Sequence, residues 1–273
     1  VAGADLLIAA TGSDEINLLC CMTAKSLNPK IHTIARLKSS EYHEQAYGMK
    51  DIFAIPLIFN PERQAAVEIE RLIRYPGFLK RDTFTKGRVE IVELKIDGAS
   101  KLCGRALSEI HSIVRSDVLV CAVLRDGVAI APDGRFVLEA SDRIFVTASA
   151  DNLSGMLKSL GIVTRKVNNV MIAGGGRLSR YLATLLIRRR IGVKIIEKDL
   201  DTCLALSEKL PEAEIIHGDA SQQTLLNSEG IKSCDAIVTL TGLDELNIII
   251  SLYANTVGVP QVITKLSRLD SMD

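Results

Sequence analysis

Short apolar segments alternate with longer, striped segments through the last third of the chain. Residues 169–173 form a mostly apolar run that predicts a buried strand, and residues 180–190 carry the apolar stripe of a helix. The same order follows, with strands predicted at 193–197 and 213–217 and a helix predicted at 200–210. Strands that alternate with helices favour a parallel sheet covered on both faces, and such sheets bind ligands at the carboxyl ends of their strands.

The middle of the chain has a different pattern. An apolar stripe follows Asn60-Pro61 and predicts a capped linking helix that ends at Pro76-Gly77. Beyond residue 87 we expect strands at 89–96, 118–124 and 143–147, helices at 103–114 and 151–160, and a hairpin turn at Arg125-Asp126-Gly127. This part predicts a small α+β domain.

A long-range repeat relates the two ends of the chain. Residues 5–17 align with residues 235–247 at a constant offset (235 − 5 = 230), and each copy is a short apolar strand followed by Thr-Gly-x-Asp-Glu-x-Asn. Residues 33–37 match residues 262–266 at an offset one residue smaller. A period this long indicates tandem duplication of whole domains, because solenoid repeats are only about 20 to 50 residues long.

The predicted fold class is α/β, with Rossmann-like parallel-sheet domains in tandem, separated by the small α+β domain. We expect residues 1–60 to be the later part of the first Rossmann-like domain, and residues 61–84 to be the linking helix and a linker. Residues 85–163 would form the α+β domain, and residues 164–273 the second Rossmann-like domain, cut before its end.

Composition narrows the function classes. The chain has 33 Lys+Arg and 33 Asp+Glu, so it offers no basic field for nucleic acid. Its apolar runs are shorter than the roughly 20 residues of a membrane-spanning helix, and its start lacks the layout of a secretion signal.

The six cysteines contain no C-x-x-C pair, which argues against a metal site. They predict buried, reduced thiols: Cys20, Cys21, Cys103, Cys121, Cys203 and Cys234.

The glycine-rich turn after the strand at 169–173 carries the clearest chemistry. Gly174 permits a tight turn, and Gly176 lets backbone amides approach a pyrophosphate at the start of a helix. Glu197 lies 21 residues beyond Gly176 (197 − 176), where an acid accepts hydrogen bonds from ribose hydroxyls. Ser179 stands where the usual pattern has Gly or Ala. Nucleotide binding is predicted, with NAD favoured over NADP because a carboxylate repels a 2′-phosphate.

Further candidates follow the other predicted strands. Gly218-Asp219 could meet an adenine edge, although an Asp at such a junction is as often a helix cap. Thr11-Gly12 and Thr241-Gly242 leave room for a ribose or pyrophosphate, and Asp14 and Asp244 behind them are expected to be caps. For Arg36 and Lys265, phosphate pairing and a solvated strand end have equal weight.

Together these features resemble the regulator-of-potassium-conductance (RCK) family. The resemblance covers essentially the whole chain. It rests on the two Thr-Gly-x-Asp-Glu-x-Asn blocks, the helix from Asn60-Pro-Glu62 to Tyr75-Pro-Gly77, and the glycine loop with Glu197 behind it. In the α+β part it rests on Leu124-Arg-Asp-Gly127 and Ser141-Asp-Arg-Ile-Phe-Val146.

The resemblance implies a non-enzymatic sensor that binds NAD or NADH, with ATP and ADP as further candidates. It also implies a tetrameric ring on the cytoplasmic face of the membrane, beneath a membrane-embedded potassium channel subunit. The implied nucleotide contacts are Gly174, Gly175, Gly176, Arg177, Leu178, Glu197 and Thr241 in the second copy, and Thr11, Gly12 and Arg36 in the first. We expect Glu197 and Asp219 to hold the adenosine, and Arg177 or Arg36 to sense the distal phosphates.

Two other functions stay open. A nicotinamide-dependent oxidoreductase would share the glycine loop and the acid, but it needs an acid or base beside the hydride acceptor. The middle domain offers only His111, which has no partner visible in the sequence. The second alternative is a Rossmann-like assembly module that binds no ligand.

Overall fold

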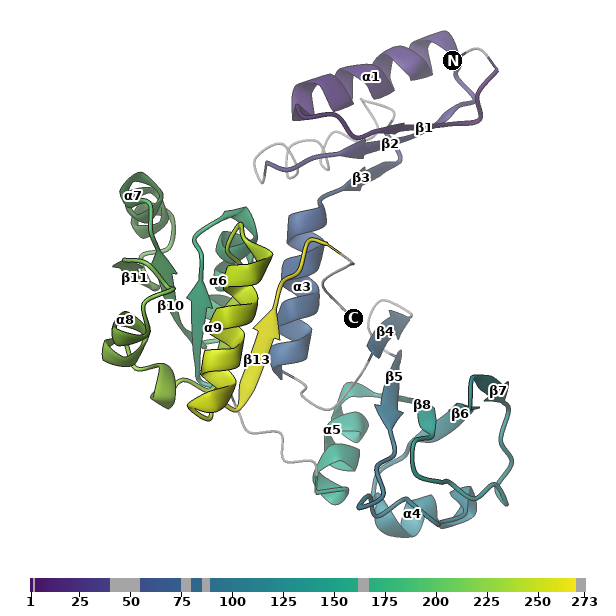
Figure 1. The fold of residues 1–273 in the computed structure, drawn as a ribbon. Coiled ribbons are helices and arrows are strands. Elements are labelled where there is room, and N and C mark those ends of the chain that lie inside the picture. The colour runs from purple at the N-terminus through teal and green to yellow at the C-terminus, as the bar shows by residue number, and fades with distance from the viewer. Residues whose placement is uncertain (2, 40–54, 75–79, 85–88, 162–166, 269–273) are drawn as a thin grey trace. The chain divides into compact units, whose positions relative to one another are not determined.

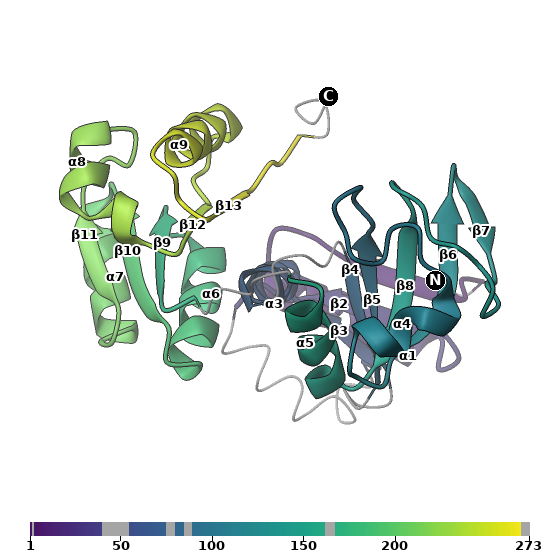
Figure 2. The same cartoon turned by 90° about the horizontal axis from the view of Figure 1, so that it is seen from below.

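The computed structural model describes residues 1, 3–39, 55–74, 80–84, 89–161 and 167–268 (Figures 1 and 2). The chain forms two compact units. One comprises Val1–Glu70 with Asn168–Asp273, and the other comprises Arg71–Val167. Within the described ranges, every helix is too short or too polar to cross a bilayer.

The second copy contains the predicted parallel sheet. Its strands are ordered β11-β10-β9-β12-β13, and every neighbouring pair is parallel. The strands are β9 (Asn169–Ala173), β10 (Gly192–Glu197), β11 (Glu214–His217), β12 (Ala236–Thr239) and β13 (Gln261–Thr264). The helices are α6 (Arg177–Arg188), α7 (Leu200–Lys209), α8 (Gln223–Ser228) and α9 (Asp244–Thr256), with a 3-10 turn, η3, at Ile231–Ser233. Helices α6 and α7 cover one face of the sheet, and α8 and α9 cover the other (Figure 2).

Helix α6 begins earlier than expected. The sequence predicts a helix over 180–190, but α6 starts directly at Arg177, with Gly176 as its N-cap residue. The early start brings the first helical amides up to the glycine loop, while Leu182 and Leu186 pack fully buried on the sheet. The helix ends at Arg188, and Arg190 beyond it has a φ of 61°.

The first copy shows the same pairing as the second. Strands β1 (Leu6–Ala9), β2 (His32–Arg36) and β3 (Leu57–Phe59) form a parallel sheet in that order, with α1 (Asp14–Leu27) between β1 and β2. Ile8 of β1 pairs with Ile34 of β2, and Val238 of β12 pairs with Ile263 of β13, which keeps the offsets found in the sequence. The parallel sheets of both copies confirm the predicted fold class.

The linking helix α3 (Pro61–Arg74) follows β3. Asn60 is its cap, because the Asn60 side-chain oxygen accepts the amide of Arg63 at 2.9 Å. The predicted end of this helix, at Tyr75-Pro76-Gly77, lies outside the described residues. So do the predicted domain boundaries near residues 85 and 163.

The second unit contains an antiparallel sheet with the order β4-β5-β8-β6-β7. The strands are β4 (Lys80–Phe84), β5 (Val89–Lys95), β6 (Leu119–Arg125), β7 (Val128–Ile130) and β8 (Arg143–Ala148), and the helices are α4 (Ile110–Ile113) and α5 (Ala150–Ser159). The expected hairpin joins β6 to β7. Asp126 and Gly127 have φ values of 50° and 79°, which the tight turn of a hairpin requires.

Two predictions for this unit were wrong. The helix expected at 103–114 is only a 3-10 turn at Leu107–Glu109 followed by α4, because the left-handed Gly104 (φ 75°) cannot lie in a helix. Strand β4 lies in the segment predicted as a linker. Its sequence, Lys-Arg-Asp-Thr-Phe, is too polar to signal a strand, and it forms the edge of the sheet through its antiparallel pairing with β5.

A buried ion pair holds the loop before β8. Arg125 donates from Nε and Nη2 to the two oxygens of Asp142 at 2.8 and 2.7 Å, and Asp142 is 1% exposed. The Arg125 guanidinium also lies 4.8 Å from the ring centre of Phe136. Hydrogen bonding by Arg125 lowers the pKa of Asp142, so this carboxyl is held in its charged form.

Candidate functional site

A cavity of about 420 Å³ opens at the carboxyl ends of the strands of the second copy. This is the edge at which parallel sheets bind ligands. Its lining consists of Gly174, Gly175, Gly176, Ile196, Glu197, Lys198, Gly218, Asp219, Ala220, Leu240, Thr241, Gly242, Leu243, Leu246 and Lys265.

The glycine loop forms one wall of this cavity. Gly174 has a φ of 101°, and a Cβ atom there would lie 2.9 Å from the carbonyl oxygen of Leu240. Only glycine tolerates both conditions. The loop leads into the twelve-residue helix α6, whose first amides have no partner inside the helix and whose dipole favours an anion. The loop is therefore suited to a phosphate group.

Glu197 ends β10 and faces the glycine loop. One carboxylate oxygen accepts the amide of Gly175 at 2.5 Å, and the other accepts the amide of Asp199 at 2.8 Å. A Cβ atom on Gly175 would lie 2.9 Å from Glu197, so the glycine permits this close approach. A carboxylate can accept about four hydrogen bonds. Glu197 is therefore fixed in place and still able to accept ribose hydroxyls.

Asp219 lies on the neighbouring wall, after β11. Its carboxylate accepts the amide of Ser221 at 2.9 Å and pairs with Lys198 at 3.1 Å. Hydrogen bonding to Ser221 and the nearby Lys198 ammonium lower the pKa of Asp219 to about 2. The cap of α8 is Gln222, so Asp219 closes the turn before the helix and does not cap it.

The repeated Thr-Gly-x-Asp-Glu-x-Asn block forms the same clamp in both copies. In the second copy, the side-chain oxygen of Asn247 accepts the amide of Thr241 at 2.9 Å, and its side-chain nitrogen donates to the carbonyl of Lys265 at 3.0 Å. In the first copy, Asn17 makes the equivalent bonds to Thr11 at 2.7 Å and to Arg36 at 2.9 Å. Each clamp fastens the end of one strand to the end of the next.

The aspartates of these blocks were predicted as helix caps, and that prediction was wrong. The N-cap residues are Ser13 and Leu243. The carboxylate of Asp14 accepts the amides of Lys38 and Ser39 at 2.9 and 2.8 Å. Asp244 accepts the equivalent amides of residues 267 and 268 at 2.8 and 3.0 Å. Both carboxylates therefore hold the loop that follows the neighbouring strand.

The cavity brings together nine candidate residues named from the sequence: Gly174, Gly175, Gly176, Glu197, Gly218, Asp219, Thr241, Gly242 and Lys265. Arg177 and Leu178 do not line it. Arg177 begins α6, and its side chain pairs with Glu62 of α3 at 3.4 Å. The hydroxyl of Thr241 donates to Asn247 at 2.7 Å, so this residue already has an internal partner.

The first copy places Thr11, Gly12 and Arg36 at the carboxyl ends of β1 and β2. The guanidinium of Arg36 donates to the carbonyl of Thr11 at 2.6 Å. The roles predicted for these three residues and for those of the second copy stay predictions.

Some of the lining was not assigned to the site from the sequence. Leu243 and Leu246 supply an apolar wall, and Leu243 is 63% exposed. Their spacing marks them as helix positions but does not show that they lie beside a cavity. Lys198 follows Glu197 directly, and its pairing with Asp219 joins two strand ends that are far apart in sequence.

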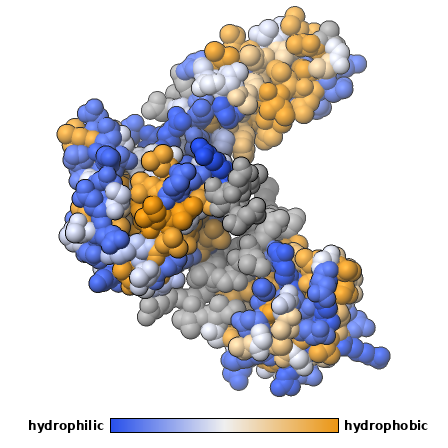
Figure 3. All heavy atoms as spheres, in the orientation of Figure 1, coloured by the Kyte–Doolittle hydropathy of each residue, from blue (hydrophilic) through white to orange (hydrophobic). Residues whose placement is uncertain are grey.

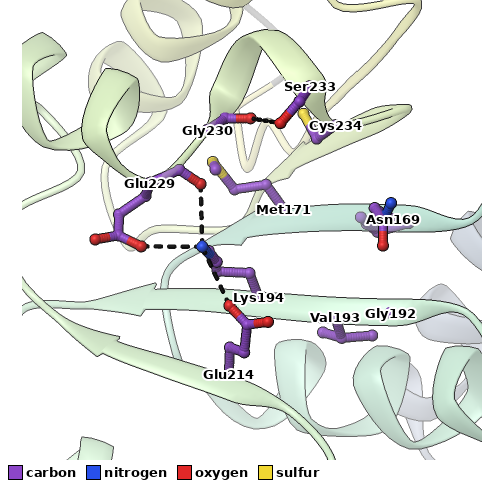
Figure 4. Close-up of a pocket in the computed structure, with 11 residues that line it drawn as sticks. Asn169, Met171, Gly192, Val193, Lys194, Glu214, Glu229, Gly230, Ser233 and Cys234 are labelled. Atoms are coloured by element: carbon purple, nitrogen blue, oxygen red, sulfur yellow. Dashed lines mark hydrogen bonds and ion pairs between the residues drawn. The ribbon is translucent and has the colours of Figure 1, made fainter.

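A second, smaller cavity of about 200 Å³ lies at the other end of the same sheet (Figure 4). Here Lys194 pairs with Glu214 at 3.1 Å and with Glu229 at 3.0 Å. These carboxylates already have a cationic partner, and Lys194 also donates to the carbonyl of Glu229 at 3.1 Å. The arrangement ties the end of α8 to β10.

The described residues contain no group of three or more His, Cys, Asp or Glu side chains arranged to hold a metal ion. Burial raises the pKa of the Cys234 thiol to about 11 and also raises the pKa of Cys21 and Cys203. These thiols are therefore held in their neutral, unreactive form. Cys20 and Cys121 are exposed, so the prediction of a buried thiol was wrong for these two cysteines.

In sequence, one parallel sheet precedes a small α+β domain and a second one follows it, and the second sheet has a glycine-loop cleft at its strand ends. This organisation defines a tandem Rossmann-like protein. The sequence matches the TrkA-N domain over residues 1–55 and 170–273, and the TrkA-C domain over residues 91–161. The chain belongs to this TrkA (RCK) family, as the sequence resemblance predicted.

Its relatives include the Trk system potassium uptake protein TrkA of Haemophilus influenzae, which is 34% identical over 271 residues. That alignment covers 98% of this chain and 59% of the relative, so the chain spans about three fifths of the relative's length.

Among solved structures, the GsuK channel aligns with a TM-score of 0.66 at 20% identity, covering 96% of this chain and 50% of that one. The GsuK channel bound to NAD aligns with a TM-score of 0.61 at 18% identity, covering 95% and 49%. Both alignments support the fold.

Proposed function

We propose that the chain is part of a nucleotide-sensing regulatory subunit of a Trk-type potassium uptake system. It acts on the cytoplasmic side, peripheral to the membrane, and controls a membrane-embedded channel subunit without catalysing a reaction. Family membership and the name of the Haemophilus relative support the potassium-uptake role. The proposed ligand is NAD or NADH, with ATP or ADP as competitors for the same cleft.

The observation that carries this proposal is the pairing of Glu197 with the start of α6 across one cavity. The amide of Gly175 lies 2.5 Å from the Glu197 carboxylate, so a ribose on Glu197 would have its phosphates beside the helix start. A diphosphate there would meet free amides and the positive end of the helix dipole. A solved structure with a similar fold is that of the GsuK channel bound to NAD, and this supports NAD as the ligand.

Nucleotide affinity tests the site directly. Titration with NADH, followed by calorimetry, should give a dissociation constant that rises about 10- to 100-fold in Glu197→Ala, because a hydrogen bond to a charged group contributes about 1.5–3 kcal/mol. Glu214→Ala is the matched control, since it removes a carboxylate at the opposite end of the sheet. Equal NADH affinity in the unmodified protein, Glu197→Ala and Glu214→Ala would contradict the proposed site. The same titration with ATP and ADP ranks the candidate ligands by affinity.

Assembly is the second part of the proposal. Helix α1 exposes Leu19 (62%) and Met22 (39%), and α9 exposes Ile249 (57%) and Leu252 (61%), which are the same two positions of the repeat. Figure 3 shows apolar residues gathered over both helices. Both internal repeats expose the same apolar stripe. We therefore assign this stripe to contacts between the subunits of a tetrameric ring, each subunit being one molecule of this chain.

Sedimentation of the Ile249→Asp, Leu252→Asp double variant tests this assignment. The variant should sediment as a smaller species than the unmodified protein at equal concentration. Leu204→Asp is the control, because Leu204 is also exposed (58%) but lies on α7. An unchanged assembly in the double variant would place the interface elsewhere.

Control of the membrane subunit requires a transport measurement. Potassium flux through vesicles that contain the membrane subunit should depend on the added regulatory subunit and on NADH or ATP. A flux that depends on neither the subunit nor the nucleotide would contradict the regulatory role. A nucleotide can control a channel only if it binds two states of the regulator with different affinity.

A further inference from the structure

The linking helix α3 of the first copy lies along α6, the helix that begins at the second copy's glycine loop. Arg177 at the start of α6 pairs with Glu62 at the start of α3 at 3.4 Å, and Arg189 beyond its end pairs with Glu70 at 3.5 Å. Residues 61–70 of α3 and the whole of α6 belong to the same compact unit of the chain. The two copies are therefore joined by more than the polypeptide between them.

A polar junction lies near the starts of both helices. The side-chain nitrogen of Asn60 donates to the hydroxyl of Tyr181 at 3.0 Å and to the carbonyl of Lys38 at 3.3 Å. The Tyr181 hydroxyl donates to that same carbonyl at 3.2 Å. Asn60 is only 4% exposed, so these groups are costly to leave without partners.

One side of the junction leads to the strand ends of the first copy, where Arg36 lies. Lys38 is two residues beyond Arg36, and the fully buried Leu37 separates them. The amide of Lys38 is bonded to the Asp14 carboxylate at 2.9 Å, at the start of α1. A movement of the loop after β2 would therefore move the carbonyl that Tyr181 and Asn60 share.

The other side leads to the second cleft, by which we mean the cavity of about 420 Å³ beside the glycine loop of the second copy. Tyr181 is four residues beyond Arg177, so it lies one helical turn along α6 from the glycine loop. A helix transmits a displacement of its first turn as a nearly rigid body. A phosphate that repositions the start of α6 would move the Tyr181 hydroxyl against Asn60 and Lys38.

We propose that the Tyr181 hydroxyl couples the cleft of the second copy to the first copy, so that nucleotide in that cleft changes the stability of residues 37–39 after β2 and of the start of α3. The proposal rests on nucleotide binding in the second cleft and adds a path between the copies. Coupling of this kind is reciprocal, and typical coupling energies correspond to a change of roughly 5- to 150-fold in affinity. Tyr181 acts as a positioning residue and does not touch the ligand.

Amide hydrogen exchange of the whole chain, with and without saturating NADH, measures the coupling. The reporters are the amides of Arg63 and Lys38, which Asn60 and Asp14 hold. Glu197→Ala isolates the part of the response that comes from the second cleft. Tyr181→Phe removes the hydroxyl and keeps the ring, and Tyr253→Phe is its control, since the Tyr253 hydroxyl bonds only to Asn227 among the described residues, at 2.7 Å.

We expect NADH to change the exchange rates of both reporters at least about fivefold in the unmodified protein and in Tyr253→Phe. The change should vanish in Tyr181→Phe, although that variant still binds NADH in the calorimeter, and in Glu197→Ala it should require about 10- to 100-fold more NADH. A full response in Tyr181→Phe, or no response in the unmodified protein despite bound NADH, overturns the coupling alone. Absence of any NADH binding overturns the proposed function together with the coupling.

Discussion

The Asn247 clamp is the feature on which the geometry of the second cleft depends most. Asn247 is fully buried, and it joins the end of β12 to the end of β13 through Thr241 and Lys265. The substitution Asn247→Leu keeps a side chain of similar size and removes every hydrogen bond. It leaves the amide of Thr241 and the carbonyl of Lys265 without the partners that they have in the folded protein.

The expected cost follows from those two groups. A buried polar group without a partner costs about 1–3 kcal/mol, so two such groups lower the local free energy of opening by about 2–4 kcal/mol when partial relaxation is allowed. Since each 1.4 kcal/mol is a factor of ten, amide exchange should become about 30- to 1,000-fold faster.

Site-resolved hydrogen exchange is the appropriate assay, because a chain with two compact units need not unfold in one step. The amides of β12 and β13 should lose protection, and those of β5 and β8 serve as an internal reference. Asn255→Leu is the control, since Asn255 is an exposed residue of the same helix. Exchange within about threefold of the unmodified rate in Asn247→Leu would refute the clamp.

Three further predictions concern other residues. Ser179→Ala should stabilise the second copy by about 1 kcal/mol in denaturant unfolding, because the Ser179 hydroxyl is buried with no hydrogen-bond partner among the described residues; a loss of stability would contradict this. Gly174→Ala should lower both stability and NADH affinity, since a Cβ there collides with the Leu240 carbonyl; unchanged thermal unfolding and titration would count against it. The pKa of Asp142 is lowered in the folded protein, so its contribution to stability is complete above the unfolded pKa of about 3.9 and is lost as pH falls through the lower folded value. Acid titration followed by near-UV circular dichroism measures this loss of stability. The loss should be smaller in Asp142→Asn.

The fold class followed from the sequence because hydrophobic periodicity and the internal repeat give the same answer. The buried runs of β9 and β12 have few polar positions, and the duplicated block fixes how β1 corresponds to β12. Strand β4 could not be found this way, because an edge strand is held by its pairing with β5 and needs little apolar sequence. The left-handed conformation of Gly104 shortened a predicted helix, and a sequence pattern does not reveal that conformation.

The candidate site was predicted in part for a similar reason. Gly174 and Glu197 lie at a spacing that reflects one strand–helix–strand unit, so local sequence carries their relation. The pairing of Lys198 with Asp219 depends on two strand ends meeting in space. The contact of Arg177 with Glu62 depends on the docking of α3 on α6, which no local pattern records. The buried Asp14 and Asp244 looked like helix caps because capping and loop-fastening use the same residue type at the same place.

The most direct test of the account is a crystal structure of this chain with NADH. We predict a diphosphate bound to the first backbone amides of α6, and a ribose whose hydroxyls donate to the Glu197 carboxylate. An empty cavity at saturating NADH, or a nucleotide bound away from both Glu197 and the glycine loop, would contradict the central claim.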